Sequence, residues 1–205
     1  MDSQSSDGQR PAQVIRDNTD QGTWLADLAI TKHGALHNPG ELTMLMRTLY
    51  YVQPATILEI GTYAGGSAWA FSRIRSVSHI VTVDIGPQAE AAERLASLPC
   101  RATQITGDST DGNTLHRVKQ ALDGYAPDLV FIDGAHDYKS ARRDWDLYSP
   151  LVAPGGLVAL HDTQGYPNNP TVEVAVLWNE IRQNWRTTEL VDKPGGPGGT
   201  GIVWI

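Results

Sequence analysis

The glycine-rich turn at residues 61–66 constrains the fold of this chain more than any other feature. It follows an apolar run of strand length, Thr56 to Ile60, and precedes a helical pattern whose apolar positions are Trp69, Ala70, Phe71 and Ile74. A second apolar strand, His79 to Val83, follows and ends on Asp84. This order predicts a β-α-β unit with a carboxylate at the tip of its second strand.

Such a turn is suited to a cofactor that contains a nucleoside. Glycine adopts positive φ at low cost and lets a ligand approach the backbone, and the helix behind it offers unpaired N–H groups, with the Ser67 hydroxyl nearby. An acid about 20 residues after the turn, here Asp84, is positioned to accept hydrogen bonds from a ribose. The dinucleotide pattern G-x-G-x-x-G is not matched, because Tyr63 stands where its second glycine belongs. The turn therefore disfavours NAD.

The segment Glu59 to Ser67, EIGTYAGGS, resembles the first motif of class I S-adenosylmethionine (SAM) methyltransferases, in the form common in small-molecule O-methyltransferases. Over residues 38–205 the resemblance implies a Rossmann-like α/β fold: a seven-stranded, mostly parallel sheet in the order 3-2-1-4-5-7-6 with helices on both faces. It implies that the first acid and the glycines surround the amino-acid end of SAM, while later acids hold the ribose and face the adenine. The cofactor-binding residues expected on this basis are Glu59, Gly61, Thr62, Tyr63, Gly65, Ser67, Asp84, Asp108, Ser109 and Asp133.

Composition bounds the class of protein. The chain has 205 residues, 40% of them apolar, which predicts a single domain over residues 21–205 after a polar, disordered tail at 1–20. With 16 Lys plus Arg against 23 Asp plus Glu and no basic stripe, nucleic acid is excluded as a partner. The sequence has no apolar run of membrane-spanning length and no secretion-signal pattern, so a cytoplasmic location is expected. The single cysteine, Cys100, excludes an internal disulfide.

Before the first strand, Asn38 and Pro39 form a helix start, with Glu41 placed to complete a capping box. The histidines at 33 and 37 and this glutamate are interpreted chiefly as loop and cap residues, with a role in a pocket left open. Ser109 and Asp111 are alternative caps for a helix over 113–122. Further helices are expected at 23–31 and 87–98, over the segment that carries Ala141, Trp145 and Tyr148, and from Asn169; further strands are expected at 102–106, 128–132, 157–160, 187–191 and 201–205.

Two later strands end in titratable side chains. The strand over 128–132 leads into Asp133 and His136, and the strand over 157–160 leads into His161 and Asp162. Parallel strands place such tips at one carboxyl edge, where open α/β sheets bind ligands. Two carboxylates and a histidine that converge there call for a cation, and oxygen-rich ligand sets suit Mg²⁺ or Mn²⁺.

The D-x-x-H segment followed by a polar pair at the next strand resembles the metal-dependent O-methyltransferases of natural-product sugars and the cephalosporin-hydroxylase-like group. The resemblance implies that Asp133, His161 and Asp162 hold the ion, that His136 removes the substrate proton, and that Asp133 also acts in catalysis. His161 stands where an acid is usual, which shifts the preference toward Mn²⁺, Fe²⁺ or no metal. Tyr166, in the insert after this tip, is the expected contact with substrate.

The function predicted from these motifs is transfer of the SAM methyl group to a hydroxyl of a small molecule, such as a sugar or another natural-product acceptor. Two alternatives stay open at this point. One is an enzyme of the same fold that uses the metal for another reaction, and the other is a non-catalytic SAM-binding partner subunit. Assembly into a homo-oligomer is compatible with the sequence, which leaves the oligomeric state open.

Overall fold

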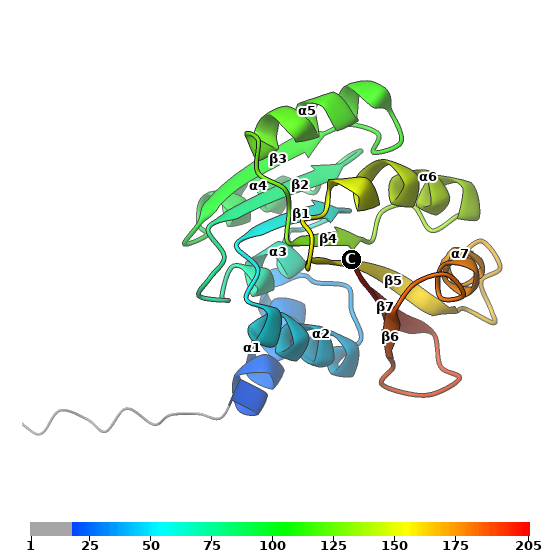
Figure 1. Cartoon of the computed structure of the whole chain (residues 1–205). Helices are drawn as coiled ribbons and strands as arrows, with labels where there is room; N and C mark the ends of the chain where they lie inside the picture. Colours follow the sequence, from blue (N-terminus) through cyan, green and yellow to red (C-terminus); the bar gives the residue numbers. More distant parts are fainter. Residues whose placement is uncertain (1–17) are drawn as a thin grey trace, which may run out of the picture.

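A computed structural model describes residues 18–205 (Figure 1). The first helix, α1 (Asn18–His33), is longer than the expected 23–31 and includes the last three residues of the predicted tail. The rest of that tail, residues 1–17, lies outside the described residues, so its disorder stays a prediction.

One seven-stranded sheet forms the centre of the described chain, in the order β3-β2-β1-β4-β5-β7-β6. Neighbouring strands run parallel except for β7, which is antiparallel to both β5 and β6. The predicted strand order is therefore confirmed. The strands are β1 (Thr56–Ile60), β2 (His79–Asp84), β3 (Arg101–Thr106), β4 (Leu129–Ile132), β5 (Leu157–Gly165), β6 (Thr187–Leu190) and β7 (Gly198–Trp204).

Helices cover both faces of the sheet, as Figure 1 shows. Alternate residues of β1 enter two separate cores, since Ile57 packs on the side of α1 to α4 whereas Leu58 and Ile60 pack on the side of α5 to α7. Within residues 18–205 no helix has both the length and the hydropathy of a membrane span. The remaining helices are α2 (Pro39–Val52), α3 (Gly66–Phe71), α4 (Ala89–Ala96), α5 (Gly112–Leu122), α6 (Tyr138–Tyr148), the 3₁₀ turn Ser149–Leu151 and α7 (Val174–Ile181).

Two elements near the carboxyl edge of the sheet, α7 and β5, differ from their predicted bounds. The helix predicted from Asn169 begins only at Val174, because Glu173 bridges to the loop after β4: its N–H donates to the His136 carbonyl at 2.7 Å and its carboxylate accepts from the Tyr138 N–H at 2.9 Å. β5 continues past its expected end to Gly165, with an irregular register after His161. Both differences bring residues 161–173 beside the tip of β4.

The glycine turn is packed between that tip and the loop after α1. Gly61 has φ +100°, and a Cβ there would lie 1.9 Å from the Asp133 carbonyl oxygen. A Cβ on Gly66 would lie 2.3 Å from the Ala35 backbone nitrogen. Glycine is required at both positions, because the backbone of another segment occupies the place of a side chain.

Candidate active site

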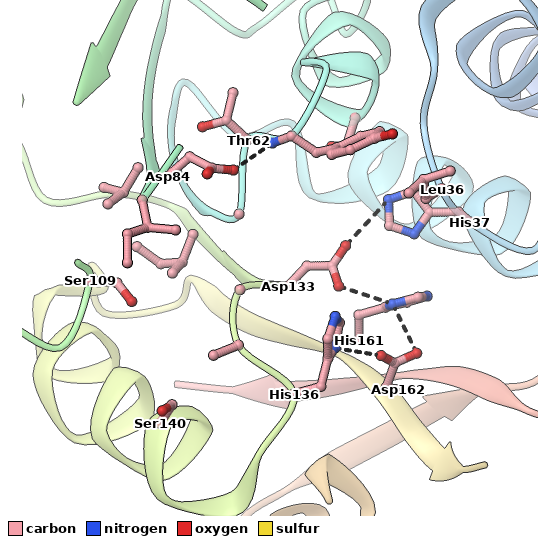
Figure 2. Close-up of a pocket in the computed structure, with 18 of the residues that line it drawn as sticks. Leu36, His37, Thr62, Asp84, Ser109, Asp133, His136, Ser140, His161 and Asp162 are labelled. Carbon is pink, nitrogen blue, oxygen red and sulfur yellow. Dashed lines mark hydrogen bonds and ion pairs between the residues drawn. The ribbon is translucent and has the colours of Figure 1, made fainter. Parts of the chain in front are cut away.

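A cavity of about 650 Å³ lies over the carboxyl ends of β1 to β5 (Figure 2). Its walls come from the glycine turn, the strand tips and the loop between α1 and α2, and its volume is in the range of small-molecule sites. Apart from Glu59 and Gly65, the sequence-predicted site residues all line this cavity: Gly61, Thr62, Tyr63, Ser67, Asp84, Asp108, Ser109, Asp133, His136, His161 and Asp162.

The carboxylate of Asp84 connects the glycine turn to the tip of β2. Its Oδ2 accepts from the Tyr63 N–H at 2.7 Å, and its Oδ1 accepts from the Gly86 N–H at 2.8 Å. Tyr63 has φ +44°, an unfavourable value for a residue with a Cβ, and this bond helps to hold it there. Asp84 is thus oriented at the cavity wall, with lone pairs left to accept hydrogen bonds from a ligand in the cavity.

Glu59 lies beneath the turn, and its side chain is fully buried. Its Oε1 accepts from the Ser67 hydroxyl at 2.5 Å, whereas its Oε2 has no hydrogen-bond partner in the described part of the chain. Burial raises the pKa of Glu59 to about 8, so its carboxyl is protonated at neutral pH in the ligand-free protein. A direct contact between Glu59 and the cofactor stays a prediction.

This buried acid leads to a prediction about stability. In the unfolded chain Glu59 ionises near its ordinary pKa of 4.5, whereas in the folded chain it holds its proton up to about 8. The folded state binds the extra proton between these values, so the free energy of unfolding falls as pH rises through this window, by at most about 1.4 kcal/mol per pH unit. Glu59→Gln removes this dependence. The melting temperature of the variant, relative to wild type and without ligand, is expected to increase from pH 5 to pH 8; a constant difference would contradict the assignment.

At the opposite end, Asp108 accepts from both the N–H and the hydroxyl of Thr110, at 2.8 and 2.7 Å. These bonds lower the pKa of Asp108 and order the loop after β3. The cap of α5 is Asp111, whose side chain accepts from the Asn113 N–H at 2.6 Å, which leaves Ser109 free of that role.

The loop after β3 packs on α6, whose Tyr148 hydroxyl donates to the Ser109 carbonyl at 2.6 Å. Asp144, one turn earlier on the helix, is fully buried there, and burial raises its pKa to about 7. No motif in the sequence marks Asp144 as a functional residue, and only the fold shows that it is buried beneath the site.

At the tips of β4 and β5, His136 and Asp162 form an ion-pair contact in which Nδ1 and Oδ2 lie 2.8 Å apart. The Tyr166 hydroxyl donates to the other oxygen of Asp162, also at 2.8 Å. The hydrogen bond to Asp162 raises the pKa of His136. Burial opposes ionisation of Asp162, but the bonds from His136 and Tyr166 and the charge of His161 outweigh it and lower its pKa. Asp162 has φ +65°, a strained conformation that aims its side chain into the site.

His161 lies at the centre of this end, 7% exposed, with its Nδ1 at 3.1 Å from one oxygen of Asp133 and 3.1 Å from one oxygen of Asp162. Burial lowers the pKa of His161, but Asp133, Asp162 and Glu41 outweigh it and raise it to about 9. The His161 ring is therefore protonated at neutral pH, and its positive charge offsets the negative charge of the surrounding acids.

Glu41 and His37, which the sequence suggested as cap and loop residues, lie beside His161 and Asp133. Asn38 does cap α2, since its side chain accepts from the Gly40 N–H at 3.2 Å, but Glu41 turns inward instead of completing a capping box. Glu41 is 2% exposed and accepts from the backbone N–H groups of Asp192 and Gly199, and its Oε2 lies 3.9 Å from His161 Nε2.

His37 lines the cavity, with its Nε2 at 3.8 Å from Asp133 Oδ2. Burial lowers the pKa of His37 to about 4, which keeps its ring neutral. His33 instead stacks on Trp69, at a ring-centroid distance of 3.8 Å, and is not among the residues that line the cavity. In the sequence these histidines look alike, and only the fold separates them.

Two groups of described residues have ligand atoms within 4.8 Å of one another and could hold a metal ion. The first is His37, Asp133 and His161, and the second is Asp133, His136 and Asp162. Each shares two members with the predicted ligand set of Asp133, His161 and Asp162. The assignment of that set stays a prediction.

Comparison with known proteins shows which sequences this chain resembles. A family model described as a methyltransferase domain matches residues 58–163. The chain is 28% identical over 127 residues to the uncharacterized protein R132 of Acanthamoeba polyphaga mimivirus, a match that covers 59% of this chain and 57% of that protein. The chain thus spans little more than half the length of this curated relative.

Solved structures share the fold. An O-methyltransferase from Bacillus cereus in complex with S-adenosylhomocysteine (SAH) is 21% identical, with a TM-score of 0.63, and the match covers 95% of this chain and 94% of that one. MycE, a methyltransferase of the mycinamycin biosynthetic pathway in complex with Mg and SAH, is 20% identical, with a TM-score of 0.62, over 89% of this chain and 54% of that one.

The strand order, the glycine turn and the carboxylates at the strand tips define a class I, Rossmann-like methyltransferase fold. The chain belongs to the family of methyltransferase domains, since the family model matches more than half of its residues. The sequence-based prediction of a SAM-dependent methyltransferase is confirmed at this level.

Proposed function

We propose that this protein transfers the methyl group of SAM to a hydroxyl group of a small molecule. The observation that carries the proposal is the His136–Asp162 pair at one end of the cavity, opposite the glycine turn and Asp84. The turn and Asp84 bind the nucleoside, whereas the pair supplies a base for the acceptor. The O-methyltransferase and MycE structures with SAH bound support the proposal by their shared fold.

The chemistry requires alignment and a proton acceptor. The methyl group of a sulfonium is already activated, so the cavity accelerates an in-line displacement mainly by positioning the two reactants. Because Nδ1 of His136 faces Asp162, Nε2 of the same ring is left to accept the proton of the hydroxyl. Asp162 fixes the tautomer and the orientation of the ring, and Tyr166 holds Asp162.

The charge of the cavity narrows the class of acceptor. Among the described residues, the cavity lining contains Asp84, Asp108, Asp133 and Asp162 but neither lysine nor arginine. An anionic acceptor would meet these carboxylates with no lysine or arginine to pair with, because the charge of His161 is already balanced by Asp133 and Asp162. Neutral or cationic hydroxyl compounds are therefore the proposed substrates. MycE, which shares the fold, is known in complex with mycinamycin VI.

A divalent ion fits the proposed acceptor end of the cavity, because two alternative groups of carboxylate and imidazole side chains, which share Asp133, have ligand atoms within reach of one ion there. When bound, such an ion would lower the pKa of an acceptor hydroxyl. Proton removal by His136 does not depend on it. Metal assistance is part of the proposal.

The test is an assay with methyl-labelled SAM and matched neutral, cationic and anionic hydroxyl compounds, with SAH formation as the readout. Neutral or cationic compounds are expected to yield SAH and a labelled ether, at rates at least about tenfold above those of anionic analogues. Absence of SAH formation with every class would contradict methyl transfer. A preference for anionic compounds would contradict the assigned acceptor class alone.

A further inference from the structure

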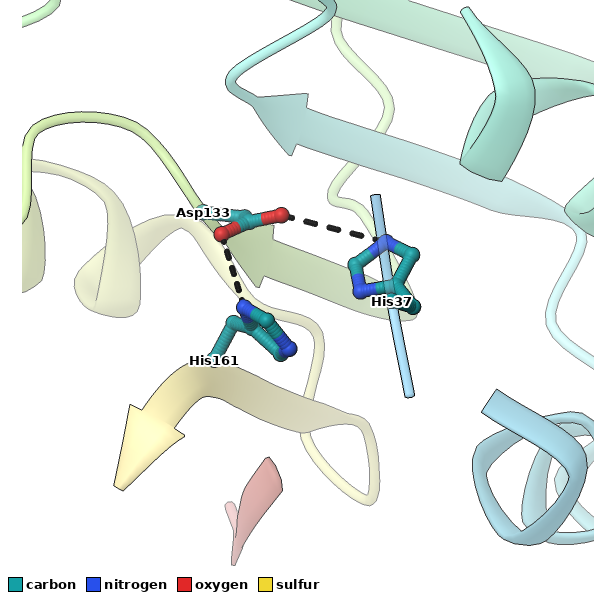
Figure 3. Close-up of side chains that lie close together, drawn as sticks. All are labelled: His37, Asp133 and His161. Carbon is teal, nitrogen blue, oxygen red and sulfur yellow. Dashed lines mark hydrogen bonds and ion pairs between the residues drawn. The ribbon is translucent and has the colours of Figure 1, made fainter. Parts of the chain in front are cut away.

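We propose that His37, Asp133 and His161 form a binding site for a divalent transition-metal ion, with two imidazole nitrogens and one carboxylate as protein ligands (Figure 3). The site refines the proposed function, on which it rests for its role, because it lies beside the acceptor end of the cavity. His37 comes from the loop between α1 and α2, far in sequence from the other two ligands. The sequence motif for metal binding does not include it.

The distances fit a shared ion. The ligand atoms of the three side chains lie within 4.8 Å of one another. His37 Nε2 is 3.8 Å from Asp133 Oδ2, too far for a hydrogen bond, yet ligands at about 2.0–2.2 Å from one ion lie roughly 3–4 Å apart. Figure 3 shows the Asp133 carboxylate between the two rings, with a separate oxygen directed at each.

Asp162 is already engaged by other side chains. Its Oδ2 pairs with His136, and its Oδ1 accepts from Tyr166. To bind an ion it would have to give up contacts that orient the proposed base. The geometry therefore assigns Asp162 to positioning His136 and leaves the metal to the three residues of Figure 3.

The two nitrogens of His161 have different neighbours. Nδ1 faces Asp133 at 3.1 Å and is the atom placed to bind the ion, whereas Nε2 lies 3.9 Å from Glu41 Oε2, and in the described chain both of these latter atoms are buried without a hydrogen bond. Such atoms are costly to bury unless something satisfies them. Glu41 is thus placed to accept from the Nε2–H of a His161 ring that binds an ion through Nδ1. The carboxylates of Asp133, Asp162 and Glu41 surround His161, and an ion that replaces the proton on His161 Nδ1 supplies the positive charge that balances them.

The site is also pre-organised. The side chains of His37, His161 and Asp133 are 5%, 7% and 17% exposed. The loop that carries His37 is held by the bond from the Ala35 N–H to the Ala29 carbonyl, at 2.9 Å, and by close packing on Gly66. A set of two imidazoles and one carboxylate suits Mn²⁺, Fe²⁺, Co²⁺ or Zn²⁺ better than Mg²⁺, which prefers oxygen ligands.

Cobalt tests the site without any turnover, because nitrogen ligation of Co²⁺ changes its visible absorption. Wild-type protein titrated with Co²⁺ is expected to bind one ion and to compete against a large excess of Mg²⁺. His37→Ala should weaken Co²⁺ binding at least about tenfold. The matched control His33→Ala changes a histidine of the same segment that does not line the cavity, and it should leave the affinity unchanged. Asp162→Asn should retain Co²⁺ binding within about threefold.

Four results would overturn the proposal: no Co²⁺ bound by wild-type protein, equal binding by wild type and His37→Ala, a larger loss in Asp162→Asn than in His37→Ala, or a preference for Mg²⁺. SAH titration by calorimetry on the same samples shows that each variant is folded. It also separates this proposal from the proposed function. Normal SAH binding and methyl transfer without Co²⁺ binding defeat the metal site alone, whereas Co²⁺ binding in a protein that never forms SAH defeats methyl transfer alone.

Discussion

Replacing His136 with alanine is expected to lower kcat for methyl transfer by about 10²–10⁴-fold, the usual contribution of a positioned general base. The Kd for SAM should stay within about twofold, because His136 lies at the proposed acceptor end of the cavity, away from the glycine turn and Asp84, which form the proposed cofactor end. Steady-state kinetics with the best acceptor and calorimetry with SAH measure the two effects separately.

The pH dependence of turnover is a second test of His136 as the base. A base acts only when it is neutral, and the hydrogen bond to Asp162 raises the pKa of His136 above its ordinary 6.5. The rate should therefore rise with pH through a value above 6.5. His116→Ala, on the exposed surface of α5, is the matched control and should leave kcat unchanged. Near-normal turnover in His136→Ala would show that another group accepts the proton.

Replacing Asp84 with alanine should weaken binding of both SAM and SAH by about 10²–10⁴-fold. Two hydrogen bonds from ribose hydroxyls to a carboxylate are each worth about 1.5–3 kcal/mol, and about 1.4 kcal/mol is a factor of ten. The change also removes the acceptor for the N–H groups of Tyr63 and Gly86, which loosens the turn that receives the cofactor. Calorimetric titration with SAH is the direct measurement.

Asp162→Ala is the comparison for this prediction, since it removes a carboxylate from the other end of the same cavity. It should impair turnover and leave the Kd for SAH within a few-fold of wild type. Equal losses of SAH affinity in the two variants would contradict the separation into a cofactor end and an acceptor end.

Local patterns account for what the sequence predicted well. The apolar strands and the glycine turn are short-range signals, and the bounds of β1 and the cap at Asn38 follow from them. The parallel arrangement of β1 to β5 then places their carboxyl ends at one edge, which is why Asp84, Asp133, His136, His161 and Asp162 meet there.

The same local rules misplaced residues whose surroundings come from distant segments. Glu41 has the right position for a capping box, but α2 packs against β7, and its carboxylate accepts from the Gly199 and Asp192 N–H groups instead. α7 begins later than its Asn169–Pro170 signal because Glu173 bonds to the loop that carries His136. No local pattern encodes either partner.

The sequence alone determined the apolar strands, the glycine turn and the acids at the strand tips, because these depend on periodicity and on residues adjacent in the chain. The strand order and the cofactor class followed from the resemblance of residues 59–67 to a methyltransferase motif. The tertiary structure alone decided which histidine enters the site and which partner each carboxylate takes. His33 and His37 are four residues apart, yet one stacks on Trp69 whereas the other faces Asp133. That choice depends on the close packing of the loop on Gly66, a contact between segments that only the folded chain brings together.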